Sequence, residues 1–268
     1  YIMSNHLDNE VLYEIDQHVA TITFNRAEKQ NTISGPMLNR LSELMLKADA
    51  DPEIRAIVIT GSGKFFCAGL DLRGSDISNN LATNKKSPVT LDLKNTPPTV
   101  LHNLDTPTIA SINGSAAGYG MDLALGCDIR VMADSAKLAA AFTARGVVPE
   151  SGGTWILPRL IGWAKASEII FTGKTLLAEE CLELGLVSHM VNNNEVGEKS
   201  LEIARQISSR APLAVQASKR MMRMGMNENF NDHVHHVFLQ LLPLFQSDDF
   251  AEGMASFMEK REAEFKGK

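Results

Sequence analysis

The sequence is poor in cysteine and has no long hydrophobic run. Its 3 cysteines in 268 residues are an odd number at spacings that fit neither a disulfide framework nor a metal site, so we expect small buried side chains in a reducing compartment. No apolar run approaches the roughly 20 residues that cross a bilayer, and the first residues have neither the apolar core of a secretion signal nor an arginine-rich transit pattern. The sequence therefore predicts a cytoplasmic protein without a membrane partner.

Positive charge is in deficit as well. The chain has 26 Lys and Arg residues against 32 Asp and Glu residues, which gives a formal net charge of -6. Binding of nucleic acid through phosphates needs clustered basic residues, so we expect no nucleic-acid partner. The 44% of hydrophobic and 22% of charged residues are instead typical of a globular protein with a sizeable core.

Strand and helix patterns alternate in the first half of the chain. The branched runs at residues 11–15 and 19–24 predict a β-hairpin. Residues 34–50 carry apolar side chains at helical spacing, with a serine as the candidate N-cap. The continuous apolar runs at residues 54–60 and 108–112 are typical of strands that helices cover on both faces. The sequence therefore predicts an α/β fold.

The second half of the chain becomes helical. Before it, residues 73–98 are polar and predict a mobile segment, a candidate lid. After residue 173 we expect helices over residues 177–184, 196–209, 213–224 and 231–265. The last of these carries an apolar stripe, which a partner subunit or the main domain must cover.

Two glycine-containing stretches follow directly after buried strands, at residues 65–72 and 113–124. Glycine permits backbone conformations in which successive N–H groups turn outward, and the second stretch begins a helix whose first amides have no partner. Two such loops could direct amides at one oxygen atom. Each stretch taken alone is better explained by an ordinary tight turn between a strand and a helix, because glycine turns are common.

Glu150 is a candidate catalytic carboxylate. It follows Pro149 and precedes a glycine turn, with a helix expected to begin near Thr154. A position at the helix end would favour the ionised carboxylate and make it a poorer base. An apolar pocket would have the opposite effect and suit proton abstraction. The residues alone leave both alternatives open.

Two other patterns resemble binding sites, and we expect neither of them to be one. Gly61-Ser62-Gly63-Lys64 lacks the first glycine of a phosphate-binding loop, and Phe65 stands where Ser or Thr would bind magnesium. A second pattern, three histidines on an expected helix, has no i, i+4 pair and no acidic ligand nearby in sequence, so it predicts a solvated face rather than a metal site: His233, His235 and His236.

Taken together, three motifs in this order and spacing resemble the crotonase superfamily, also called the enoyl-CoA hydratase/isomerase family. They are the loop at residues 67–72, the stretch at residues 113–128 and the segment at residues 146–153. The resemblance extends over nearly the whole chain, with further matches at Phe24-Asn25-Arg26, Leu157 to Gly162, Thr172-Gly173-Lys174, Ala178 to Val187 and Glu252 to Phe265.

This resemblance implies a fold, an assembly and a substrate class. The fold is a spiral of β-β-α turns over residues 1–200, followed by a C-terminal helical trimerisation region over residues 201–268. The assembly is a homotrimer or a dimer of trimers. The substrate is an acyl-CoA thioester, and no separate cofactor is expected because coenzyme A is part of the substrate.

The resemblance also assigns roles to individual residues. The backbone N–H groups of Leu70 and Tyr119 take the positions of the two oxyanion donors, although the family usually has glycine in place of Tyr119. Family hydratases use two glutamates, whereas here the first position holds Asp122 and the second holds Phe142. The positions near the CoA moiety are Arg26, Lys29, Lys64, Ala68 and Lys260; an exposed surface side chain is the alternative for each of the cations.

The leading hypothesis is therefore an enoyl-CoA isomerase in which Glu150 is the single acid/base. Asp122 is an assisting or water-positioning carboxylate, or an acid that merely caps its own helix. One alternative is an enoyl-CoA hydratase that uses Asp122 and Glu150 as an altered pair. Other enolate chemistry, such as that of a hydrolase, dehalogenase or decarboxylase, and a catalytically inactive CoA-binding protein are further alternatives.

Overall fold

The computed structural model describes residues 9–71 and 93–268. The chain begins with the predicted hairpin, in which β1 (Val11–Asp16) pairs with β2 (Val19–Phe24) in antiparallel register. Gln17 and His18 both have positive φ angles, the backbone that a two-residue hairpin turn requires. The hairpin forms one edge of the larger sheet.

Two sheets make up the body of the molecule. The first has six strands in the order β1-β2-β3-β5-β7-β10, and it is parallel from β2 onward. The second has four strands in the order β4-β6-β8-β9. Beyond the hairpin, the strands are β3 (Ala56–Gly61), β4 (Phe65–Cys67), β5 (Thr108–Ile112), β6 (Ser115–Ala117), β7 (Ile129–Ala133), β8 (Lys137–Ala139), β9 (Thr175–Leu177) and β10 (His189–Val191).

Each turn of the chain adds one strand to each sheet and then a helix. The repeating units are β3-β4-α4, β5-β6-α5 and β7-β8-α6. This order confirms the expected spiral of β-β-α turns. The helices of the body are α2 (Gly35–Ala50), α4 (Pro97–Asn103), α5 (Tyr119–Gly126), α6 (Gly153–Ile161), α7 (Trp163–Thr172), α8 (Ala178–Glu183) and α9 (Val196–Ser208); short 3-10 turns lie at η1 (Ala27–Lys29), η2 (Leu93–Asn95) and η3 (Thr143–Arg145).

The six-stranded sheet contributes many of the buried side chains of the hydrophobic core, from β2, β3, β5 and β7. All five residues of β5 are buried, as its continuous apolar run predicts. Helix α9 packs against β2, β3, β5 and β7, and helix α2 packs against the hairpin strands. The expected domain boundary at residue 200 falls within α9, which belongs to the body, so the separate helical region begins after it.

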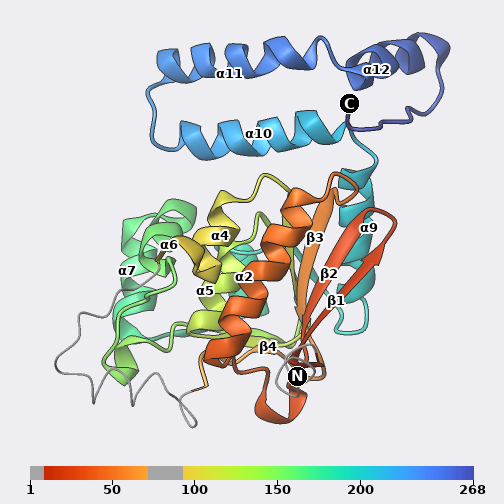
Figure 1. Cartoon of the computed structure of the whole chain (residues 1–268). Helices are drawn as coiled ribbons and strands as arrows, with labels where there is room; N and C mark the ends of the chain where they lie inside the picture. The colour runs from red at the N-terminus through yellow and green to blue at the C-terminus, as the bar shows by residue number, and fades with distance from the viewer. Residues whose placement is uncertain (1–8, 72–92) are drawn as a thin grey trace, which may run out of the picture.

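Three helices form an arm beside this body: α10 (Pro212–Gly225), α11 (Phe230–Leu244) and α12 (Asp248–Glu259) (Figure 1). We expected one element over residues 231–265, but the structure has two helices with a break after residue 244. Ser247 caps the second helix, because its side chain accepts a hydrogen bond from the Phe250 amide. The expected lid at residues 73–98 lies mostly outside the described residues, which resume at η2.

Within the described parts of the chain, every helix is too short or too polar to cross a membrane. The three cysteines are free and buried, as expected.

Candidate functional site

The loop after β4 holds the amide of Leu70. Ile33 donates its N–H to the carbonyl oxygen of Gly69 at 2.9 Å, and Asp71 donates to the carbonyl oxygen of Ile33 at 2.9 Å. In this parallel bridge the N–H of the residue between them turns to the opposite side. The Leu70 amide therefore points away from Ile33 and accordingly away from the sheet edge that holds its loop.

Arg26 also holds the loop that contains Leu70. Its side chain is 5% exposed, and it forms ion pairs with Asp71 at 3.1 Å and with Glu10 at 3.2 Å. It also donates a hydrogen bond to the carbonyl oxygen of Thr32 at 2.8 Å. Because Asp71 directly follows Leu70, this buried pair holds the backbone that presents the Leu70 amide. The sequence suggested Arg26 only as a CoA-binding cation, and its buried guanidinium is instead occupied by these partners.

The second amide, that of Tyr119, lies at the start of α5. Gly118 has φ 53° and ψ −123°, a conformation that residues with a side chain rarely adopt, and its N–H donates to Ala139 at 3.0 Å. This turn changes the chain direction between β6 and α5. Tyr119 itself has no positive φ, so a side chain is tolerated at this position where the family usually has glycine.

The two amides are brought together by close contact between their segments. A Cβ atom placed on Gly69 would lie 3.7 Å from the Tyr119 nitrogen, and one placed on Gly120 would overlap the carbonyl oxygen of Cys67. Within residues 9–71 and 93–268, neither the Leu70 nor the Tyr119 N–H donates a hydrogen bond. Two unpaired amides thus lie on neighbouring segments, an arrangement able to bind one oxygen atom.

Asp122 lies on α5 next to these amides, but its carboxylate is already engaged. It is 2% exposed, and one oxygen accepts hydrogen bonds from the Ser151 hydroxyl at 2.8 Å and the Gly153 amide at 3.1 Å. It therefore caps the N-terminus of α6, not that of its own helix as one of our interpretations had it. Burial raises the pKa of Asp122 to about 7, although the two hydrogen bonds oppose this shift.

Glu150 is in the turn that leads into α6, next to the serine that binds Asp122. Its side chain is exposed, whereas its neighbours Pro149 and Ser151 are buried. Among the described residues, no group forms a hydrogen bond or an ion pair with the Glu150 carboxylate. Its charge acts on both Asp122 and Tyr119, whose pKa values it raises in addition to the larger effect of their burial. The carboxylate is thus within electrostatic range of both residues and has no partner among the described residues.

Phe142 supplies an apolar wall where a hydratase would have its second glutamate. The side chain is buried, and its Cε1 atom lies 3.9 Å from the position of a Cβ atom on Gly118. Position 142 therefore supplies no group that could donate a proton to a substrate or accept one from it.

Three of the expected CoA-binding residues lie near one another. Ala68 donates its N–H to the carbonyl oxygen of Gln30 at 3.1 Å, which joins the Leu70 loop to the end of η1. Lys29 is at that end and Lys64 is in the β3–β4 turn beside it; both side chains are exposed. Lys260 is the C-cap residue of α12, and Figure 1 shows α12 at the opposite end of the molecule from β4.

Two contributors to the site were missed by the sequence analysis. Ser151 and Gly153 hold Asp122, and a Cβ atom at position 153 would overlap that carboxylate. The signal was present in the Ser-Gly-Gly sequence before α6, since small residues at a helix N-terminus leave room for an anion. Its partner could not be inferred because Asp122 comes from a different helix.

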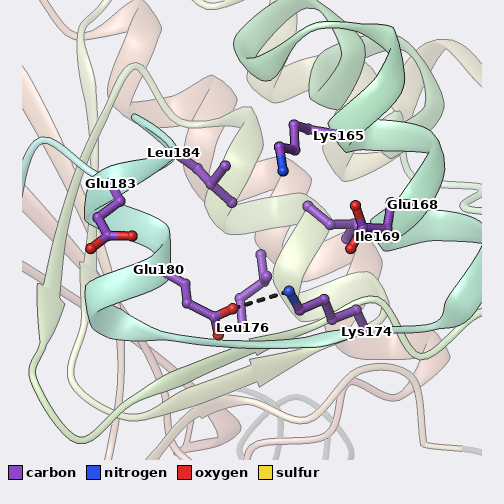
Figure 2. Close-up of a pocket in the computed structure, with 8 residues that line it drawn as sticks. All are labelled: Lys165, Glu168, Ile169, Lys174, Leu176, Glu180, Glu183 and Leu184. Carbon is purple, nitrogen blue, oxygen red and sulfur yellow. Dashed lines mark ion pairs between the residues drawn. The ribbon is translucent and has the colours of Figure 1, made fainter.

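A separate hollow lies between α7, β9 and α8 (Figure 2). Opposite charges face each other in it, and Lys174 pairs with Glu180 at 3.0 Å. None of the candidate catalytic residues lines this hollow; its lining consists of Lys165, Glu168, Ile169, Lys174, Leu176, Glu180, Glu183 and Leu184. Among the described residues, no three His, Cys, Asp or Glu side chains are arranged to hold a metal ion. The expected solvated histidines on α11 are partly paired, because His233 and His236 both contact Glu228.

Comparison with known proteins finds relatives that match nearly the whole chain. A family model described as enoyl-CoA hydratase/isomerase matches residues 14–268. A short-chain-enoyl-CoA hydratase from Clostridium acetobutylicum is 32% identical over 96% of this chain and 97% of its own. A 1,2-epoxyphenylacetyl-CoA isomerase from Escherichia coli is 30% identical over 96% of this chain and 98% of its own. The crystal structure of an enoyl-CoA hydratase from Bacillus anthracis has a TM-score of 0.88 at 32% identity, covering 97% and 100% of the two chains.

Proposed function

The chain belongs to the enoyl-CoA hydratase/isomerase family, and we propose that it moves a carbon–carbon double bond within an acyl-CoA thioester. One observation carries this proposal: of the two candidate carboxylates, Asp122 is bound by Ser151 and Gly153, while Glu150 has no partner within the described residues. A double-bond shift needs a single acid/base, whereas hydration by the two-glutamate route needs two. Phe142 at the second position is consistent with the simpler reaction.

The amides of Leu70 and Tyr119 bind the thioester oxygen. As the substrate loses a proton, negative charge collects on that oxygen, and two fixed N–H donors stabilise it. Loss of one such donor typically costs about 3 to 4 kcal/mol of transition-state stabilisation. The ion pair of Arg26 with Asp71 supports the proposal indirectly, because it holds the loop that carries one of the donors.

Glu150 then moves a proton between two carbons. With a 3-enoyl thioester, the carboxylate takes the proton from C2, and the electron pair of that C–H bond spreads over the acyl chain and the thioester oxygen. The protonated Glu150 returns the same proton to C4, the double bond ends between C2 and C3, and the carboxylate is regenerated. No water is consumed, and atoms and charge balance.

We assign the CoA moiety to the edge formed by Lys29, Lys64 and Ala68. The two exposed lysines offer cations to its phosphates there, and no further cofactor takes part in the steps above. Arg26 is left out of this assignment because its guanidinium is buried and paired. Lys260 remains a candidate that the arm contributes.

Hydration is the second candidate, and the state of Asp122 favours it. With a pKa of about 7, this carboxyl is protonated in a large fraction of molecules near neutrality and lies close to Glu150. Addition of water to a 2-enoyl thioester uses one group to accept a proton from water and another to donate a proton to carbon, and two carboxyl groups in different environments can divide these roles.

The test is turnover of matched 3-enoyl-CoA and 2-enoyl-CoA substrates by the wild type, Glu150→Gln and Asp122→Asn, with products resolved by mass. We expect isomerisation without a gain of water, a fall of about 10²- to 10⁴-fold in Glu150→Gln, and activity within a few-fold of wild type in Asp122→Asn. A gain of water that requires both acids would replace the isomerase with the hydratase. Binding of acyl-CoA without turnover of either substrate, by protein shown to be folded, would indicate an inactive CoA-binding protein.

A further inference from the structure

Tyr119 has a buried ring and an unpartnered hydroxyl. Only 7% of its surface is exposed, so the ring is fixed in the core of the site. Within residues 9–71 and 93–268, its hydroxyl forms no hydrogen bond, and it is not among the enclosed polar atoms that lack a partner. The buried ring thus carries a hydroxyl that the described residues leave unpaired. Tyr13 provides the contrast, since its hydroxyl is enclosed and unpartnered.

The surroundings of this hydroxyl make it a hydrogen-bond donor. Burial, and then the charge of Glu150, raise the pKa of Tyr119 well above its usual value, so the phenol stays neutral at every physiological pH. On the other side of Gly118, Phe142 offers no acceptor. The same residue contributes its backbone N–H to the proposed oxyanion site, so on that assignment a bound thioester would bring its acyl group to the residue that carries this ring.

We propose that the Tyr119 hydroxyl donates a hydrogen bond to an oxygen atom on the acyl chain, so that the protein prefers oxygen-substituted acyl-CoA thioesters to plain hydrocarbon ones. This inference rests on the proposed function only in requiring an acyl-CoA ligand. The physical reason is that a hydrocarbon chain would cover the hydroxyl without pairing it, and an unpaired buried donor is costly. Sites that hydrogen-bond a substrate oxygen discriminate against analogues that lack it.

The test is binding of saturated thioesters, which have no double bond to move. Butyryl-CoA, 3-hydroxybutyryl-CoA and 4-hydroxybutyryl-CoA are titrated by calorimetry into the wild type and Tyr119→Phe, and mass spectrometry checks that the ligands are unchanged. We expect the wild type to bind at least one hydroxylated thioester about 3- to 10-fold more tightly than butyryl-CoA. Tyr119→Phe should lose this preference while its affinity for butyryl-CoA stays equal or improves.

Tyr13→Phe is the matched control, because it removes the same atom from a phenol on β1, outside the site; its preference should equal that of the wild type. The inference is overturned if the wild type has no preference, or if Tyr119→Phe keeps it. It is also overturned if Tyr119→Phe lowers only turnover and alters its pH profile, since the hydroxyl would then serve Glu150. Absence of isomerase activity would refute the proposed function and leave this result standing, whereas failure to bind any of the three thioesters would refute both.

Discussion

At the scale of single residues, the site is shaped by how each carboxylate is held. Asp122 is buried and bound, and Glu150 is exposed and unbound within the described chain. Both were found from the sequence as candidate acids. Their different states could not be predicted, because they depend on Ser151 and Gly153, which approach Asp122 only in the folded chain.

The buried state of Asp122 predicts a pH dependence of stability. Because burial raises its folded pKa to about 7, above the ordinary value of an aspartate, the folded chain binds a proton that the unfolded chain releases between about pH 4 and 7. This group therefore contributes most below about pH 4, and its contribution is lost as the pH rises through 7. Asparagine does not titrate, so Asp122→Asn should not show this loss of stability. The difference in free energy of unfolding, variant minus wild type, should therefore be up to about 4 kcal/mol larger at pH 8 than at pH 4.

Chemical denaturation of both proteins at fixed protein concentration from pH 4 to pH 8 measures this difference. Parallel profiles would show that the pKa of Asp122 in the folded protein is close to its value in the unfolded chain. Such a result would also remove the observation that favours hydration.

At the scale of elements, glycines allow β4 and α5 to approach closely. The position of Gly120 against the Cys67 carbonyl leaves no room for a methyl group, and the obstacle is backbone that cannot move aside. The contact sets the separation of the two amides that we assign to the thioester oxygen.

Gly120→Ala should therefore reduce stability by about 1 to 3 kcal/mol and lower kcat at least 10-fold, because it pushes α5 away from the Leu70 loop. Thermal melting and steady-state kinetics measure the two effects. Gly197→Ala is a suitable control: Gly197 is helical and exposed with open space around it, so alanine there should be neutral or stabilising by up to about 1 kcal/mol. Full activity in Gly120→Ala would show that catalysis does not depend on the close contact between Gly120 and the Cys67 carbonyl.

Long elements were predictable from the sequence and short ones were not. The hairpin, α2 and β5 have clear periodicity or continuous apolar runs, and the structure confirms them. The strands of the second sheet are three residues each, too short to show any period. The division between α11 and α12 was missed because the apolar stripe continues across it, although Ser247 is an N-cap residue that marks it.

At the scale of the whole molecule, the arm is incompletely covered. Helix α10 is held to the body by ion pairs, Arg223 with Asp105 at 3.2 Å and Lys219 with Asp128 at 2.7 Å. By contrast, α11 has no buried residue, and large apolar side chains on the arm lie open, with Phe230 78% and Phe257 79% exposed. Exposed apolar surfaces of this kind are typical of sites where a protein contacts another protein, a membrane or a ligand.

Together with the assembly that the family resemblance implies, this exposed arm leads us to expect that the protein sediments as a trimer or a dimer of trimers at micromolar concentration. Phe257→Glu should shift it to smaller species, because the interface would then bury an unpaired charge. Analytical ultracentrifugation of both proteins checks this. A wild type that sediments as a monomer would mean that the arm is not an interface between copies of this chain.

The position of Tyr119 has a consequence for how substrate range can diversify. On the proposed assignment its main-chain amide takes part in the chemistry while its side chain meets the acyl group, and every amino acid except proline supplies that amide. A saturation library at this one codon would thus vary the selected substrate while retaining the enolate chemistry. Evolution could explore new substrates here by single substitutions, without passing through inactive ancestors.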